Sequence, residues 1–288
     1  MRSPADDTEL KFLSLNTGSM RAHPFPEVLD ALRRHGISIV SPWREQIAEI
    51  GLKQASKLLR DGGFLLSGYC RAGLFPTDPE RRQEVRDDNR RAVDEAAELG
   101  AACLVVVVGG LPQFTHPGSK PSRDIAAARA EVHDGLAGLL DYAEKAGVKL
   151  GLEPLHPISA AQRSCVNTLR QALDICDTLD PDRRRGLGVT VDVYHVWWDF
   201  EVYEQIRRIG RERLFAFHVS DWLVPTDNML AGRGMMGDGV IEIAKLRRAV
   251  EAAGYDGPCE VEVLSDAWAK RPLDEFLSAA VERYRTVC

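Results

Sequence analysis

Several signals that would indicate a specialised class of protein are absent from these 288 residues. The six cysteines show no CxxC spacing and are too sparse for a disulfide framework, so a reducing cytoplasm is expected. No apolar run is long enough to span a bilayer, and the N-terminal stretch MRSPADDTEL contains no apolar signal core. The net charge of −6 offers nothing to attract a phosphate backbone, so nucleic acid is not an expected partner.

Short apolar runs alternate with helical patterns along the whole chain, without a linker or a break in composition. The predicted strands are 10–15, 37–40, 64–67, 104–108, 149–152, 188–191, 214–219 and 260–264. The predicted helices are 26–34, 52–60, 79–98, 123–146, 168–178, 202–209, 242–253 and 272–287. Eight strand–helix repeats predict one α/β domain over residues 1–288, a single (β/α)8 TIM barrel. The alternative, an open doubly wound sheet, is expected to carry a phosphate-binding glycine turn after an early strand, and neither GxGxxG nor GxxxxGK(S/T) occurs there.

Four of the predicted strands lead to a side chain that can bind a metal. These side chains are Glu153 in KLGLEP, Asp192 in GVTVDVYH, His218 in LFAFHVSD and Glu262 in CEVEVLSD. Because successive residues of a strand face opposite sides, each of the four shares its face with a small or polar residue two positions earlier, while the other face is bulky and apolar. That alternation is typical of barrel strands whose outer face packs on helices and whose inner face leads to a site at the C-terminal mouth.

A shared placement of four such residues indicates a metal site. A single glutamate after a strand is usually a surface carboxylate, and a single histidine behind two phenylalanines is usually a core residue. The same placement in four strands, spread over about 110 residues, is much harder to obtain from packing alone. Three carboxylates and one imidazole suit one divalent cation, Mn²⁺ first, with Mg²⁺, Co²⁺ or Zn²⁺ as alternatives. One carboxylate of the set can also transfer a proton.

With these residues the chain resembles the xylose isomerase-like TIM-barrel superfamily. That group includes sugar phosphate isomerases/epimerases, D-tagatose 3-epimerase-like enzymes, inosose dehydratase-like proteins and endonuclease IV. The superfamily has a glutamate after strand five, Asp-x-x-His after strand six, a histidine in strand seven and a glutamate in strand eight. The matching residues here are Glu153, Asp192 with His195, His218 and Glu262.

The connection 223–239 is predicted to fold over the metal. Keto-sugar epimerases have Arg-x-x-x-Gly-x-Gly after strand seven, which matches Arg233, Gly237 and Gly239. So many glycines in one connection indicate unusual backbone angles or a close approach to a ligand. The resemblance implies that Arg233 holds a hydroxyl or carboxylate group of the substrate, whereas the alternative is a solvated arginine on a flexible loop.

Three further residues are candidates for substrate binding. His195 is expected to contact a substrate oxygen or to orient Asp192. Tagatose-type epimerases carry a second glutamate six residues beyond the strand-five ligand, but this chain has Ser159 there, so His156 is the nearby polar candidate. Trp197 either walls a substrate pocket or packs a loop.

The resemblance implies an enzyme, a metal-dependent sugar or keto-polyol isomerase or epimerase that works through an enediolate. Glu153 and Glu262 are then the acid/base pair as well as metal ligands. The alternative is a dehydratase or lyase acting on a keto-inositol or a 3-keto-glycoside, because elimination shares the proton-abstraction step. A non-catalytic sugar-binding barrel and an endonuclease IV-like nuclease are less favoured. The expected partner is a small sugar or polyol, and since barrels of this group often associate, a homo-oligomer stays open.

Overall fold

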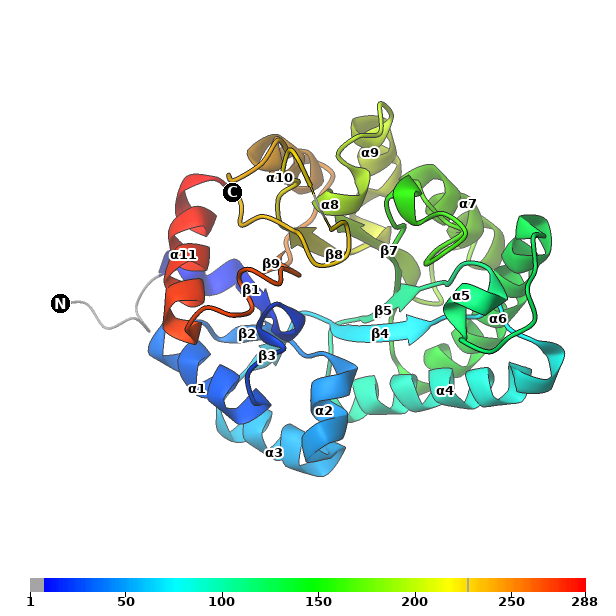
Figure 1. Ribbon diagram of the computed structural model, residues 1–288, viewed down its shortest axis with the longest axis horizontal. Helices are drawn as coiled ribbons and strands as arrows, with labels where there is room; N and C mark the ends of the chain where they lie inside the picture. The colour runs from blue at the N-terminus through cyan, green and yellow to red at the C-terminus, as the bar shows by residue number, and fades with distance from the viewer. Residues whose placement is uncertain (1–7, 227) are drawn as a thin grey trace.

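The computed structural model describes residues 8–226 and 228–288; the stretch 1–7 and position 227 lie outside it, and with them most of the N-terminal segment considered above. Nine parallel strands form one sheet in the order β3-β2-β1-β9-β8-β7-β6-β5-β4, and helices surround it (Figure 1). The chain therefore adopts a TIM barrel, as predicted. No helix among the described residues is long and apolar enough to cross a bilayer.

The elements alternate as the repeat pattern requires. The strands are β1 Leu13–Asn16, β2 Ile39–Ser41, β3 Leu65–Leu66, β4 Tyr69–Gly73, β5 Leu104–Val107, β6 Leu150–Leu152, β7 Leu187–Asp192, β8 Leu214–Val219 and β9 Cys259–Val261. The longer helices are α1 Phe25–Arg34, α2 Arg44–Ile50, α3 Leu52–Asp61, α4 Arg82–Leu99, α6 Ile125–Ala146, α7 Leu169–Leu179, α9 Val202–Arg213, α10 Ile243–Ala252 and α11 Leu273–Thr286. One-turn helices are η2 Thr8–Phe12, η3 Thr17–Met20, η4 Pro79–Arg81, α5 Pro112–Thr115, η5 Pro157–Ser159 and α8 Val193–Val196.

The third strand position of the barrel is divided between β3 and β4. The sequence predicts one strand over 64–67, but β3 pairs only with β2, and after Gly68 the chain continues as β4, which pairs with β5. The N–H of Cys70 donates to the carbonyl of Pro42, so the barrel wall stays connected across the division. Tyr69–Gly73 was not predicted as a strand because YCRAG has no run of apolar residues, and its register shifts between Cys70 and Ala72.

The predicted start of the first strand at Leu10 is wrong. Residues Thr8–Phe12 form the 3-10 helix η2, and β1 begins at Leu13. The Phe12 side chain is 39% exposed and lies under the Lys11 ammonium, so the apolar run at 10–15 is only partly a core sequence.

Both ends of the described chain meet on one side of the ring. Helix α11 lies beside α1 and closes the circle of helices (Figure 1). Arg34 in α1 lies 2.9 Å from the carboxylate of Asp274 in α11, an exposed contact that contributes less to stability than the packing beneath it.

The barrel interior is polar, as the alternation of residues predicts. The Ser67 hydroxyl lies 2.7 Å from the Ser14 hydroxyl and donates to Glu260, and the Asn16 amide donates to the same carboxylate. Gly151 has no room for a side chain, because a Cβ there would lie 2.6 Å from the hydroxyl of Thr190. The apolar side chains of the strands face outward and join the helices in one continuous core.

Candidate metal centre at the C-terminal mouth

The four predicted metal-binding side chains converge at the C-terminal mouth, the end of the barrel where the carboxyl ends of the strands lie. Glu153 follows β6, Asp192 ends β7, His218 lies near the end of β8, and Glu262 follows β9. Each can offer one ligand atom such that all four atoms lie within 4.8 Å of one another, and all four residues are buried. Parallel strands bring their carboxyl ends to one edge, so residues distant in sequence meet there.

The inward atoms of this group have no hydrogen-bond partner. Nδ1 of His218 lies 3.2 Å from Oε1 of Glu153 and 3.6 Å from Oε2 of Glu262, without the alignment of a hydrogen bond. All three atoms are buried and make no hydrogen bond among the described residues, although Oε2 of Glu262 also lies 3.2 Å from Nη1 of Arg233. Buried polar atoms are normally satisfied, so oxygen and nitrogen atoms that converge without partners fit a cation that would coordinate them. The residues therefore form a group that can bind a divalent metal.

Burial and neighbouring charges separate the two glutamates. Burial raises the pKa of Glu153 to about 7, with a smaller opposing effect from His218. Burial also disfavours the charged form of Glu262, but the positive charges of Arg233 and His218 outweigh it and lower its pKa to about 2. Burial lowers the pKa of His218, yet the surrounding carboxylates, Glu260 foremost, raise it well above the ordinary value. Two carboxylates with such different affinities for a proton are typical of sites that transfer protons.

Glu260 contacts the other nitrogen of His218. Its Oε1 lies 3.4 Å from Nε2 of His218, and Asn16 and Ser67 each donate a hydrogen bond of 2.8 Å to its carboxylate. A carboxylate on the far nitrogen of a histidine fixes the orientation of the ring toward a metal. The sequence prediction assigned no role to Glu260. Glu260 lies two residues before Glu262 and so shares its strand face, and this spacing could have identified Glu260 as part of the site.

Arg233 lies inside the site and is buried. Its Nη1 lies 2.7 Å from Oδ2 of Asp192 and 3.2 Å from Oε2 of Glu262, and its guanidinium stacks 4.5 Å from the ring centre of Tyr194. Its Nη2 lies 3.2 Å from Nε2 of His195. These contacts place Arg233 between Asp192 and Glu262 on one side and His195, which follows β7, on the other.

Asp221 holds the connection that carries Arg233. Its carboxylate accepts hydrogen bonds from the backbone N–H groups of Trp222, Gly237 and Ile241, which lie on both sides of the arginine. A Cβ at Gly239 would lie 2.2 Å from the carbonyl oxygen of Trp222. The beginning and the end of this loop therefore approach each other closely enough to require glycine.

His195 is neutral and points at the same carboxylate. Its Nδ1 accepts a hydrogen bond from the backbone N–H of His156, and its Nε2 lies 3.7 Å from Oδ2 of Asp192. Burial lowers the pKa of His195 to about 3.

Aromatic rings line the mouth next to these residues. The His156 ring stacks on Trp222 at 4.6 Å and meets Trp198 edge-on, and Trp197 lies 5.8 Å from Trp222. The indole N–H of Trp197 is buried without a hydrogen-bond partner among the described residues. The sequence prediction did not include Trp222, which only the fold brings to this cluster.

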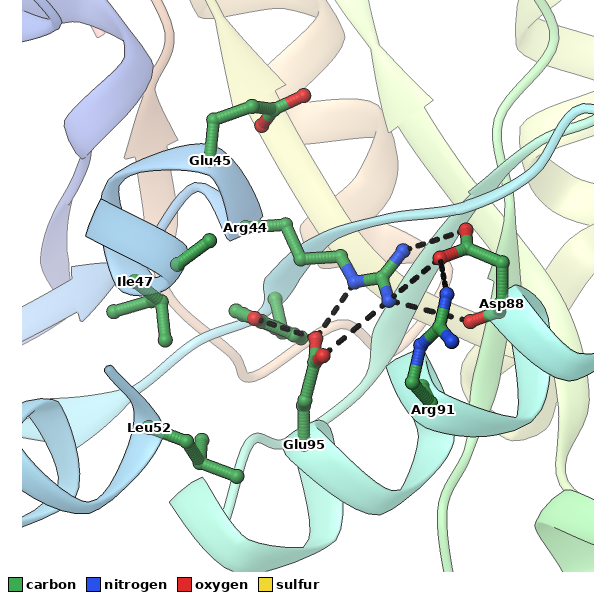
Figure 2. A pocket seen from close by; sticks show the side chains of 9 residues that line it. Arg44, Glu45, Ile47, Leu52, Asp88, Arg91 and Glu95 are labelled. Carbon is green, nitrogen blue, oxygen red and sulfur yellow. Dashed lines mark hydrogen bonds and ion pairs between the residues drawn. The ribbon is translucent and has the colours of Figure 1, made fainter. Parts of the chain in front are cut away.

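A separate cavity of about 380 Å³ lies on the outside of the barrel, between α2, α3 and α4 (Figure 2). Arg44 dominates it and donates hydrogen bonds to Asp88 and Glu95, while the Tyr69 hydroxyl also donates to Glu95. Its polar groups satisfy one another, so it has the character of a structural ion-pair network.

The family of the chain follows from comparison with known proteins. The family model described as xylose isomerase-like TIM barrel matches residues 27–284, nearly the whole of the chain. The chain belongs to this family. The superfamily resemblance seen in the sequence is thereby confirmed.

Three similar proteins illustrate the range of the family. Protein SMc04130 from Sinorhizobium meliloti 1021 has a crystal structure that is 52% identical with a TM-score of 0.91, covering 97% of this chain and 99% of that one. Fructoselysine 3-epimerase of Escherichia coli O157:H7 is 26% identical over 82% of this chain and 81% of its own length. A probable endonuclease 4 of Thermoplasma acidophilum is 26% identical over 59% of this chain and 56% of its own length.

Proposed function

We propose that this family member is a divalent-metal-dependent isomerase or epimerase of ketoses or keto-polyols. The observation that carries the proposal is the convergence of Glu153, Asp192, His218 and Glu262, with buried atoms of Glu153, His218 and Glu262 that make no hydrogen bond among the described residues. The similarity to fructoselysine 3-epimerase over most of both chains supports the sugar substrate class.

One divalent ion would be held by these four side chains. Three carboxylates and one imidazole favour Mn²⁺ over softer ions, with Mg²⁺, Co²⁺ and Zn²⁺ as alternatives. When bound, the ion supplies Lewis-acid stabilisation of the negative charge that develops on a substrate carbonyl oxygen.

Glu153 and Glu262 would move the proton. Glu153 takes a proton from the carbon between the carbonyl and a hydroxyl of the substrate, which leaves a cis-enediolate. Glu262, which enters the site from another strand, would take up a proton from solvent and deliver it to the opposite face of that carbon, while Glu153 releases its proton to solvent, and the result is epimerisation. Return of a proton to the neighbouring carbon instead gives isomerisation.

The substrate contacts follow from the residues above the metal-binding group. Arg233 is placed to donate hydrogen bonds to substrate oxygens, since its guanidinium already lies among Asp192, Glu262 and His195. His195 donates from Nε2 to a hydroxyl or keeps Asp192 in position. His156 and Trp197 form part of the wall on which the carbon skeleton of a sugar can pack.

Elimination is the second candidate. If the enediolate carries a leaving group on the next carbon, its expulsion gives a dehydratase or lyase acting on a keto-inositol or a 3-keto-glycoside. A nuclease like endonuclease IV is disfavoured, because its trinuclear site needs additional histidines and the described residues provide one group of metal-binding side chains.

A substrate panel in D₂O tests the proposal. The protein is supplied with Mn²⁺ and incubated with ketoses, keto-inositols and 3-keto-glucosides, and ¹H NMR follows the carbon-bound protons. Exchange of one proton beside a carbonyl, together with a new epimer or isomer, is the expected result. Loss of water or of an aglycone selects the eliminating enzyme, and the absence of exchange across the panel with metal bound contradicts both.

A further inference from the structure

A turn after β6 holds Arg163 at the mouth. The backbone N–H of Arg163 donates to the carbonyl of Ser159, and the neighbouring Ser164 forms a parallel bridge with Gly109 at the end of β5. The N–H of Leu111 donates to the carbonyl of Ala161 at 2.6 Å. The contacts of Ala161 and Ser164 hold the turn against the segment that follows β5, so the position of the Arg163 backbone is set by the barrel.

Arg71 approaches the same place from the neighbouring strand. It lies in β4, which pairs with β5, so the two arginines flank one edge of the mouth. The charges acting on the Arg163 guanidinium are those of Arg71 and Arg233, which repel it, and of Glu153 and Glu262, which attract it. Burial lowers the pKa of Arg163, and the two neighbouring guanidinium groups lower it further.

The Arg163 guanidinium has no partner in the described part of the chain. It is partly buried, yet it makes no hydrogen bond and no ion pair with any residue that the structure describes. Arg71 has a single contact, 3.7 Å from a carboxylate oxygen of Glu45, whose side chain is 58% exposed. The buried arginines Arg213 and Arg233 and the partly buried Arg44 are all paired with carboxylates. Charged groups that lose much of their hydration are usually paired, so two neighbouring arginines with little or no pairing are available to an anion.

Metal binding would make the mouth more positive. Five carboxylates (Glu45, Glu153, Asp192, Glu260 and Glu262) face three guanidinium groups (Arg71, Arg163 and Arg233), a formal balance of two negative charges. A divalent cation would cancel that balance. The repulsion that the carboxylates exert on a negatively charged ligand would then be offset, and Arg163 would be free to pair with that ligand.

We propose that Arg163 and Arg71 bind an anionic group of the substrate, a carboxylate or a phosphate, at the end remote from its keto-hydroxyl carbons. The planar guanidinium suits both groups, since each offers two oxygens to a pair of N–H donors. The inference rests on the proposed function only in taking the substrate to be a ketose or keto-polyol.

Three matched ketoses test the anionic group. D-Fructose, D-fructose 6-phosphate and D-fructuronate share one keto-hydroxyl end and differ at the sixth carbon, which is neutral, phosphorylated or a carboxylate. Isothermal titration of the Mn²⁺-loaded protein, at constant ionic strength, gives the dissociation constant of each. At least one anionic ketose is expected to bind about 10- to 100-fold more tightly than D-fructose. A preference for D-fructose 6-phosphate identifies the group as a phosphate, and a preference for D-fructuronate identifies it as a carboxylate.

Two variants assign the preference to Arg163. Arg163→Gln should remove most of the preference and Arg163→Lys should keep part of it, with the unfolding midpoint showing that each variant is folded. The matched control is Arg248→Gln, on the exposed side of α10, where no change is expected. Equal binding of the three ketoses, or a preference that survives in Arg163→Gln, would overturn the inference.

Proton exchange in D₂O separates this inference from the proposed function. Exchange without any preference for an anionic ketose retains the epimerase and rejects the anion site. A preference that depends on Arg163 without exchange retains the anion site and rejects the epimerase.

Discussion

Oε1 of Glu260 lies 3.4 Å from Nε2 of His218, while Nδ1 of the same ring faces Glu153 at 3.2 Å. The imidazole is thus placed between a carboxylate that orients it and the carboxylates with which it would share a metal. Glu260 is in turn held by Asn16 and Ser67, so its position depends on strands from the opposite end of the chain. The polar interior of the barrel therefore supports the site from below.

The first prediction follows from the contact between Glu260 and His218. Glu260→Gln should weaken Mn²⁺ binding by about 10- to 100-fold, because a neutral amide no longer stabilises the proton on Nε2 or the basicity of Nδ1. Isothermal titration with Mn²⁺ measures the change, and Glu204→Gln on the exposed face of α9 is the control. An affinity equal to that of the parent would show that Glu260 serves only to fill the barrel.

The second prediction separates the duties of two metal-binding residues. Glu153→Gln should retain most metal binding and lose about 10²- to 10⁴-fold in turnover, as expected for the removal of a general base. His218→Ala should instead lose metal affinity. Metal titration and D₂O exchange are measured on both variants, and an equal loss of metal in the two would mean that Glu153 is a ligand without a role in proton transfer.

The third prediction concerns Arg233. Arg233→Lys should reduce substrate affinity or turnover by about 10-fold or more, because a lysine cannot contact Asp192 and a substrate oxygen with one planar group. Steady-state kinetics on the active ketose of the panel measure it. Arg247→Lys, half-buried on α10 away from the mouth, is the matched control. Unchanged kinetics in Arg233→Lys would reject a role for this arginine in substrate binding.

The fourth prediction is a pH dependence of stability. Burial alone would raise the pKa of Asp88, but hydrogen bonds from Arg44 and Arg91 lower it below its ordinary value (Figure 2). A carboxyl group whose pKa is lower in the folded state stabilises that state at pH values above its pKa in the unfolded chain, about 3.9. This contribution is lost as the pH falls through the pKa of the group in the folded state. Because Asp88 is half exposed, Asp88→Asn should cost about 1 kcal/mol or less at pH 7.

Urea unfolding of the parent and of Asp88→Asn measures this difference. It should be constant from pH 7 to about pH 5 and shrink below about pH 4. Asp182→Asn, at an exposed position, is the control and should show no difference at any pH. A difference that grows as the pH falls would contradict the assignment of the lowered pKa to Asp88.

The sequence by itself determined the strand faces and the four side chains that converge at the mouth. The alternation of a strand is local, so Gly151 with Glu153 and Thr190 with Asp192 could be assigned to one face without knowledge of any neighbour. Helix ends are also local. Gly100 and Gly147 close α4 and α6 with φ of 69° and 70°, the left-handed conformation that glycine adopts without strain.

Only the tertiary structure decided how the rest of the site is assembled. The division of the third strand position depends on which neighbour each half can pair with, and YCRAG shows no periodicity that reveals it. Glu260 acquires its role because Asn16 and Ser67 reach it across the barrel. Arg163 lies in an irregular turn, and its place at the mouth comes from hydrogen bonds to the end of β5. Contacts between loops and distant strands carry no sequence period, so they become visible only when the barrel closes.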